Sequence, residues 1–142
     1  MQELTKLYSP YIKAQSENPF HFEKKTDVQL TLKAYNPVCG DRYEIFISGN
    51  PGEIYFHGFG CAISKASTSF LAKVISGKQT PEALALCNEF LDFIDKKIDA
   101  RQLTLGNDCL AFAGVHDFPE RYDCVTLSWK AMKKYLEKQK EK

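Results

Sequence analysis

The spacing of apolar residues changes once along this chain, and the change limits what the chain can fold into. Between residues 28 and 58, apolar and polar side chains alternate, as in Val28, Leu30, Leu32 and Ala34, which is the period of a half-buried strand. After residue 61, apolar side chains recur every three or four positions, which is the period of a helix. The sequence therefore predicts strands in its first half and helices in its second half.

Three segments carry the strand pattern: residues 28–35, 43–48 and 53–58. Asn36 and Pro37 end the first of them. The next two are joined by residues 49–52, whose sequence Gly-Asn-Pro-Gly favours a tight hairpin turn. We therefore expect a three-stranded antiparallel sheet.

The helical pattern predicts four helices. The first precedes Asn18 and Pro19, and the second covers residues 63–74 and ends at Gly77, a residue typical of a helix C-terminus. The third is expected to begin with a capping hydroxyl at Thr80 and to continue to Ile98. Residues 105–116 are expected to form a loop with a short turn, and the last helix is expected to begin at residues 118–119 and to run through Leu136.

Length and charge restrict the function. The 142 residues predict one domain spanning residues 1–142, and 19 basic against 18 acidic residues give a net charge of +1, which does not indicate a nucleic-acid partner. No apolar run approaches the roughly 18 residues of a membrane span, and no secretion signal precedes the first apolar pattern. We expect a soluble cytoplasmic protein without a membrane partner.

Five cysteines, an odd number without regular spacing, argue for free thiols or metal ligands rather than a disulfide framework. Cys39, Cys61 and Cys124 each stand beside turn-forming residues, where a metal could approach, and Asp41 could add a carboxylate. Such a shell suits zinc. From spacing alone, three independent buried thiols explain the pattern equally well.

Cys61 is the cysteine most suited to be a thiolate. It lies between the third predicted strand and the first turn of the following helix, where free amides and the helix dipole stabilise a negative charge. Gly58 and Gly60 leave space for an incoming group. Cys87 and Cys109 are flanked by apolar residues and are assigned to packing.

Three blocks of sequence carry a family resemblance: residues 36–41 (NPVCGD), 58–67 (GFGCAISKAS) and 114–124 (GVHDFPERYDC). Together they resemble the U-type iron–sulfur scaffold family, which includes IscU and NifU N-terminal domains. The sequence is most similar to the SufU branch, because a longer segment precedes Cys124 and no histidine stands immediately before it.

The resemblance implies an α+β fold, with a three-stranded antiparallel sheet and helices packed on one face. It also implies a Zn²⁺ site formed by Cys39, Asp41, Cys61 and Cys124. By the same match, Cys61 receives persulfide sulfur from a SufS-type cysteine desulfurase that carries PLP, and Arg121 helps to dock that partner or to steer the sulfur. Downstream iron–sulfur assembly proteins would be the next partners.

Two other functions remain open at this point. The same ligands could hold a nascent [2Fe–2S] cluster, which would make the protein an assembly scaffold. Alternatively, the protein could be a small structural zinc protein that only binds partners. We favour sulfur transfer, because exchange of one zinc ligand would release a nucleophile on demand. A carboxylate in the shell makes such exchange easier, since oxygen suits zinc less well than sulfur does.

Overall fold

The computed structural model describes residues 9–28, 30–38, 40–49 and 52–141. The strands and helices follow one another along the chain as α2 (Pro10–Glu17), β1 (Leu30–Asn36), β2 (Asp41–Gly49), β3 (Gly52–Phe59), α3 (Ala62–Ile75), α4 (Thr80–Ile94), the 3₁₀ segments η1 (Ala100–Gln102), η2 (Asn107–Asp117) and η3 (Pro119–Arg121), and α5 (Tyr122–Glu141).

The three strands form one antiparallel sheet in the order β1-β2-β3, as the alternating pattern predicts. Asn36 pairs with Asp41 at one end of the sheet, and Gly49 pairs with Gly52 at the other. Strand β2 begins two residues earlier than expected, because the ladder with β1 extends to Asp41. Asp41 is thus the first residue of a strand and its side chain is buried.

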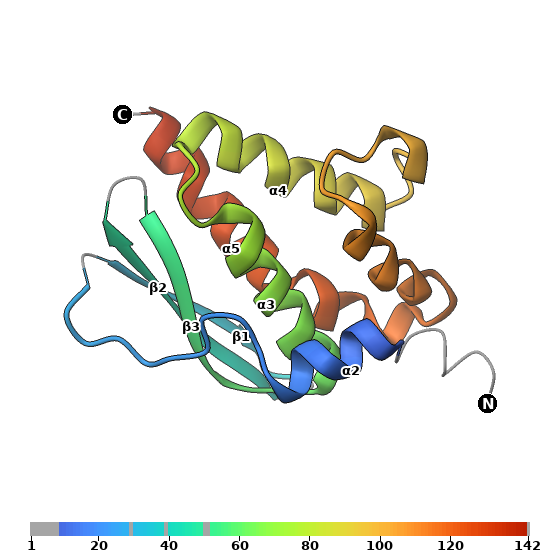
Figure 1. Cartoon of the computed structure of the whole chain (residues 1–142), viewed down its shortest axis with the longest axis horizontal. Coiled ribbons are helices and arrows are strands. Elements are labelled where there is room, and N and C mark those ends of the chain that lie inside the picture. The colour runs from blue at the N-terminus through green and yellow to red at the C-terminus, as the bar shows by residue number, and fades with distance from the viewer. Residues whose placement is uncertain (1–8, 29, 39, 50–51, 142) are drawn as a thin grey trace.

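The helices cover one face of the sheet, so the α+β prediction is confirmed (Figure 1). Helices α3 and α5 lie next to the sheet, and α4 packs on α5. The inward side chains of β2 and β3, such as Ile45 and Phe56, are fully buried. The sheet therefore contributes one apolar face to the core.

Helix α4 ends earlier than predicted. It stops at Ile94, and Lys96 then takes a left-handed conformation with φ 63°. The amides of Lys96 and Lys97 turn back onto the carbonyls of Phe93 and Asp92 at 3.1 and 2.8 Å. This pattern satisfies the last carbonyls of a helix and terminates it. The apolar period that continues to Ile98 does not reveal this ending.

Two more helix boundaries differ from the sequence prediction, and one agrees. The prediction that the Thr80 hydroxyl caps α4 is wrong. Thr80 is the first helical residue, and the N-cap is Gln79, whose side chain makes no capping hydrogen bond. The last helix, α5, begins at Tyr122 rather than at residues 118–119, because Phe118 separates η2 from η3 and Pro119 begins η3. Gly77 follows the C-cap of α3 with φ 77°, as predicted.

An aromatic cluster holds the helices together. Trp129 of α5 stacks on Phe90 of α4 with ring centroids 4.0 Å apart, and Phe70 of α3 packs against both rings. The indole Nε1–H of Trp129 donates to Ser67 Oγ at 3.1 Å, so this buried donor is satisfied. The cluster fixes α3 against α5 and so sets the distance between their N-termini.

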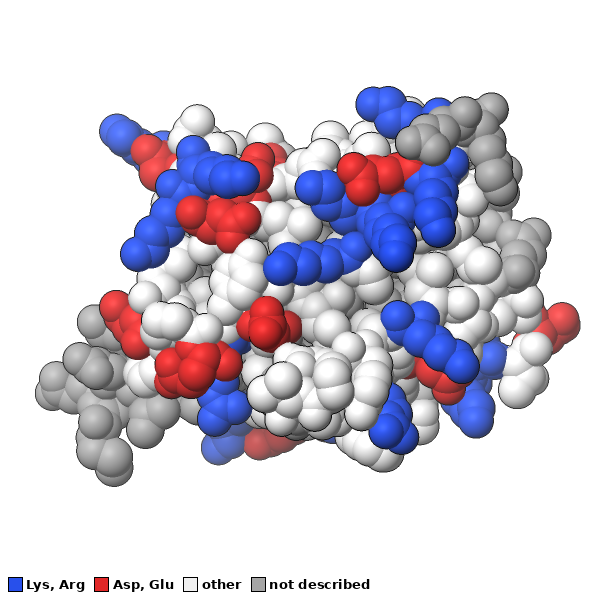
Figure 2. Space-filling model, turned by 180° about the vertical axis from the view of Figure 1, so that it is seen from behind, with Lys and Arg blue, Asp and Glu red and all other residues white. Residues whose placement is uncertain are grey.

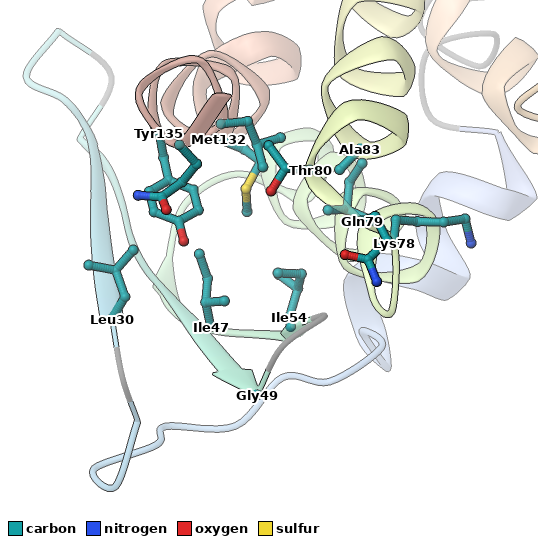
Figure 3. A pocket seen from close by; sticks show the side chains of 14 residues that line it. Leu30, Ile47, Gly49, Ile54, Lys78, Gln79, Thr80, Ala83, Met132 and Tyr135 are labelled. Carbon is teal, nitrogen blue, oxygen red and sulfur yellow. The ribbon is translucent and has the colours of Figure 1, made fainter. Parts of the chain in front are cut away.

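A hollow of about 390 Å³ lies between the β2–β3 hairpin, the start of α4 and the second half of α5 (Figure 3). Ile47, Ile54 and Met132 form part of its apolar lining, and Tyr135 borders it. It lies toward the end of the sheet where Gly49 pairs with Gly52. It is therefore separate from the end of the sheet where Asp41 lies.

Charged side chains of both signs are interspersed on the face shown in Figure 2. This mixture agrees with the near balance of 19 basic and 18 acidic residues. Among the described helices, none is both long and apolar enough to cross a membrane.

Candidate metal centre

Three side chains from distant parts of the chain meet at one end of the sheet. They are Asp41 at the start of β2, Cys61 at the N-cap of α3, and Cys124 in the first turn of α5. One ligand atom from each lies within 4.8 Å of the other two. The fourth predicted ligand, Cys39, lies outside the described residues. The role of these residues as metal ligands remains a prediction.

The turn between β1 and β2 brings Asp41 into the site. Gly40 has φ 76°, a conformation that favours glycine, and its N–H donates to the Asn36 carbonyl at 2.8 Å. The chain therefore reverses directly into β2. Side chains then alternate, so Asp41 and Tyr43 point inward while Arg42 is exposed.

One oxygen of Asp41 has a hydrogen-bond partner and the other has none. Oδ1 accepts the N–H of Cys61 at 3.1 Å. Oδ2 is buried without a hydrogen-bond partner among the described residues. A buried carboxylate oxygen is costly unless something positive meets it. The unpartnered oxygen beside two sulfurs thus fits a divalent metal ion, and the sulfur and carboxylate donors suit zinc.

Cys61 is placed to be a thiolate. Its Sγ caps α3 by accepting the N–H of Ser64 at 3.5 Å. A hydrogen bond from the Cys124 thiol, together with the Ser64 N–H, lowers the pKa of Cys61 to about 6. The same hydrogen bond and burial raise the pKa of Cys124. In the metal-free protein this arrangement favours the thiolate at Cys61 over a thiolate at Cys124.

Two supporting residues, Tyr43 and Ser64, were missed in the sequence. Ser64 Oγ donates to the Cys61 carbonyl at 3.0 Å, so its contact with the Tyr43 hydroxyl at 2.7 Å is one in which Tyr43 donates. Both side chains are buried, and burial raises the pKa of Tyr43. Their spacing offered a signal: Tyr43 stands two residues after Asp41 on the same strand face, and Ser64 three residues after the N-cap.

Gly60 leaves the space in which these groups meet. A Cβ atom at this position would lie 2.5 Å from Asp41 Oδ1, 2.5 Å from Ser64 Oγ and 2.6 Å from the Tyr43 hydroxyl. Three buried polar groups thus converge where only glycine fits. The arrangement of these groups therefore depends on position 60 having no Cβ atom.

Arg121 and two further cysteines complete the candidate residues. Arg121 is half-buried at the end of η3, immediately before α5, and its role stays a prediction. Cys87 and Cys109 are fully buried in the core, and burial raises the pKa of each thiol to about 12. This burial agrees with their assignment to packing.

The difference between the thiols predicts selective alkylation of the metal-free protein. With chelator present, iodoacetamide is expected to modify Cys61 at neutral pH and to leave Cys87 and Cys109 unmodified. The rate at Cys61 should fall as the pH drops through about 6, because the thiolate is then protonated. Peptide mass spectrometry over a pH series measures this. A midpoint near the free-cysteine value of about 8.5 would contradict the predicted stabilisation of the Cys61 thiolate.

A sheet covered on one face by helices, with two sulfurs and a carboxylate gathered at its end, defines a candidate metal-binding α+β domain. Residues 7–142 match the family described as NifU-like N terminal domain. The chain therefore belongs to this family, which includes the IscU and SufU proteins.

Two relatives cover nearly the whole chain. The zinc-dependent sulfurtransferase SufU of Bacillus subtilis (strain 168) is 36% identical over 96% of this chain and 93% of its own length. The iron–sulfur cluster assembly scaffold protein IscU of Streptococcus pyogenes serotype M1 is 33% identical over 97% of this chain and 87% of its own length. The two differ little in similarity to this chain.

Solved structures show the same fold. A structure described as an iron–sulfur cluster assembly scaffold protein for the SUF system, from Fervidobacterium islandicum AW-1, has a TM-score of 0.80 and 26% identity. The matched region covers 89% of this chain and 94% of the Fervidobacterium chain. The N-terminal part of a NifU-like protein from Brucella abortus has a TM-score of 0.82 at 17% identity, covering 99% of both chains. The second likeness concerns the fold alone.

Proposed function

We propose that the protein is a zinc-dependent sulfurtransferase that takes persulfide sulfur from a SufS-type, PLP-bearing cysteine desulfurase for iron–sulfur cluster assembly. The observation that carries this proposal is that the half-buried Cys61 sulfur, at the N-terminus of α3, lies in the same cluster as Asp41, which has an unpartnered buried oxygen. One group offers a nucleophile and the other a place for a cation.

Asp41, Cys61 and Cys124 would hold the zinc ion, and Cys39 is the fourth ligand that the family resemblance implies. When bound, zinc keeps thiols deprotonated and shields them from oxidation. The carboxylate would make this shell less sulfur-rich than a four-cysteine structural site, so one ligand would exchange more easily.

The transfer itself needs only sulfur chemistry. The Cys61 thiolate attacks the terminal sulfur of the donor persulfide, forming a new S–S bond while the donor's own S–S bond breaks. The donor cysteine leaves as a thiolate, and Cys61 becomes the persulfide. No oxidant or reductant is consumed. The Ser64 amide, which faces the Cys61 sulfur, stabilises its negative charge before the attack.

The relatives support this proposal in part. The SufU relative is named a zinc-dependent sulfurtransferase, and its 36% identity extends over 96% of the chain. We assign Arg121 to docking the desulfurase or steering the sulfur, because it stands three residues before Cys124 in the matching motif. Downstream iron–sulfur assembly proteins would then receive the sulfur.

The second candidate is a scaffold that assembles a [2Fe–2S] cluster on the same residues. The IscU relative, at 33% identity over 97% of the chain, favours it, and thiolate donors suit iron–sulfur clusters as well as zinc. In this function the cluster is cargo. The two functions differ in the resident metal and in whether Cys61 carries a single sulfur.

Anaerobic purification followed by metal analysis and a desulfurase assay tests the proposal. We expect one zinc per chain, faster cysteine turnover by the desulfurase when the protein is present, and a mass increase of one sulfur atom on the peptide with Cys61. Iron and sulfide in equal amounts would instead establish the scaffold. Zinc without any stimulation or sulfur loading would indicate a structural zinc protein.

A further inference from the structure

Exposed apolar side chains gather at one end of the sheet. In the described part of the chain, four large apolar residues are well exposed, and three of them belong to this end: Tyr35 is 53%, Val38 93% and Phe59 65% exposed. Tyr35 is the last residue but one of β1, Val38 lies in the β1–β2 turn and Phe59 ends β3. Scattered exposed residues need no explanation, but a cluster indicates an interaction surface.

An arginine lies in the middle of this cluster. Arg42 of β2 is the cross-strand neighbour of both Tyr35 and Phe59, so the three side chains form a row across the outer face of the sheet. The Arg42 guanidinium lies 5.1 Å from the centre of the Tyr35 ring. The row borders a shallow hollow of about 530 Å³ on the sheet. We call Tyr35, Arg42 and Phe59 the aromatic–arginine row.

The charges on this face favour an acidic partner. Arg42 has no ion pair among the described residues. In the next row of the sheet, Lys33 stands opposite Glu44, so their charges offset one another. The Arg42 charge is therefore left for a carboxylate from outside. Tyrosine and arginine are also among the residue types that dominate binding energy in protein interfaces, and phenylalanine is enriched at interface cores.

The row lies at the same end of the sheet as the reactive sulfur, on the face opposite the inward-pointing Asp41. Arg42 directly follows Asp41, and Phe59 stands two residues before Cys61. Sulfur transfer requires the donor persulfide to come within bonding distance of Cys61. Because the row and Cys61 lie at the same end of the sheet, a donor protein that reaches this sulfur is placed to contact the row as well.

We propose that the aromatic–arginine row is the surface on which the sulfur-donor protein docks, and that it receives an apolar segment carrying a carboxylate next to the donor's reactive cysteine. This inference rests on the proposed sulfur transfer. The apolar side chains would be desolvated at the centre of the contact. The carboxylate would pair with Arg42 there, where the surrounding apolar contacts exclude water.

Calorimetry of the zinc-loaded protein with the SufS-type cysteine desulfurase of the same genome tests the inference. We expect Arg42→Glu and Phe59→Ala each to raise the Kd about tenfold or more, as loss of a central interface residue does. The zinc content and the melting temperature should match those of the unchanged protein. Salt should weaken binding of the unchanged protein more steeply than binding of Arg42→Ala, because only the former loses an ion pair to screening.

Leu110→Ala and Arg101→Ala are the matched controls, because they remove an exposed apolar residue and an exposed arginine elsewhere on the surface. Both should bind the desulfurase like the unchanged protein. Equal Kd values for the row variants and these controls would overturn the inference. So would a dimer of this chain that Arg42→Glu breaks while desulfurase binding is unchanged.

The experiment also separates this inference from the proposed function. If the unchanged protein binds the desulfurase but no sulfur reaches Cys61, sulfur transfer fails, while loss of binding in the row variants still supports the docking surface. If sulfur reaches Cys61 equally well in the row variants at limiting protein concentration, sulfur transfer stands and the docking surface is wrong.

Discussion

Replacing Cys61 by serine is expected to abolish sulfur loading. Serine retains an oxygen that can accept the Ser64 amide at the start of α3, so the helix should stay intact. An alcohol cannot form a persulfide, and its proton is held far more tightly than that of a thiol. The rate of the desulfurase with this variant should therefore equal that of the desulfurase alone, and mass spectrometry should find no added sulfur.

Cys87→Ala is the control for this experiment. Cys87 is fully buried in the core, so its loss should lower stability slightly through a small cavity and leave sulfur loading unchanged. Sulfur found on Cys124 in the Cys61→Ser protein, with full stimulation of the desulfurase, would show that the wrong cysteine has been assigned as acceptor.

Replacing Gly60 by alanine is expected to weaken zinc binding by about 10- to 100-fold, the usual effect of disturbing the groups that orient a metal ligand. The new methyl group would stand 2.5 Å from Asp41 Oδ1 and from Ser64 Oγ, so the carboxylate has to move. Asp41 would then lose its hydrogen bond from the Cys61 amide. Competition with a zinc-binding dye measures the affinity, and circular dichroism verifies that the variant is folded.

Gly77→Ala separates this effect from ordinary glycine strain. Gly77 has φ 77°, and a Cβ there would meet nothing within 4 Å, so alanine should cost about 1 kcal/mol of stability without touching the metal site. We expect its zinc affinity to be unchanged. A Gly60→Ala protein that binds zinc as tightly as the Gly77→Ala protein would mean that Asp41 is not a ligand.

The sheet was predictable because each strand buries one face, and the alternation records which face that is. The start of β2 was not, because the pairing of Asn36 with Asp41 depends on the partner strand rather than on local composition. The end of α4 was missed for a related reason. Lys96 is not a residue that normally marks a left-handed turn, so only the folded backbone shows the stop.

The candidate site divides in the same way. Cysteines beside glycines and turn residues pointed to Cys61 and Cys124, and the family resemblance singled out Asp41. Tyr43 and Ser64 were missed, since a tyrosine and a serine in these positions also fit an ordinary strand and helix start. Their contribution depends on a hydrogen-bonded chain from Tyr43 through Ser64 to the Cys61 carbonyl. Such a chain links residues that are 21 positions apart, and no local pattern records it.

Because one sulfur atom both begins α3 and is the proposed nucleophile, position 61 faces two opposing selective demands. An oxygen-bearing residue would secure the first turn of the helix more firmly than a long, weak contact to sulfur does. Only a cysteine sulfur can form the persulfide. A substitution at position 61 that raises thermal stability should therefore also abolish sulfur transfer. Thermostable variants of this protein are therefore better sought in the aromatic core than at the start of α3.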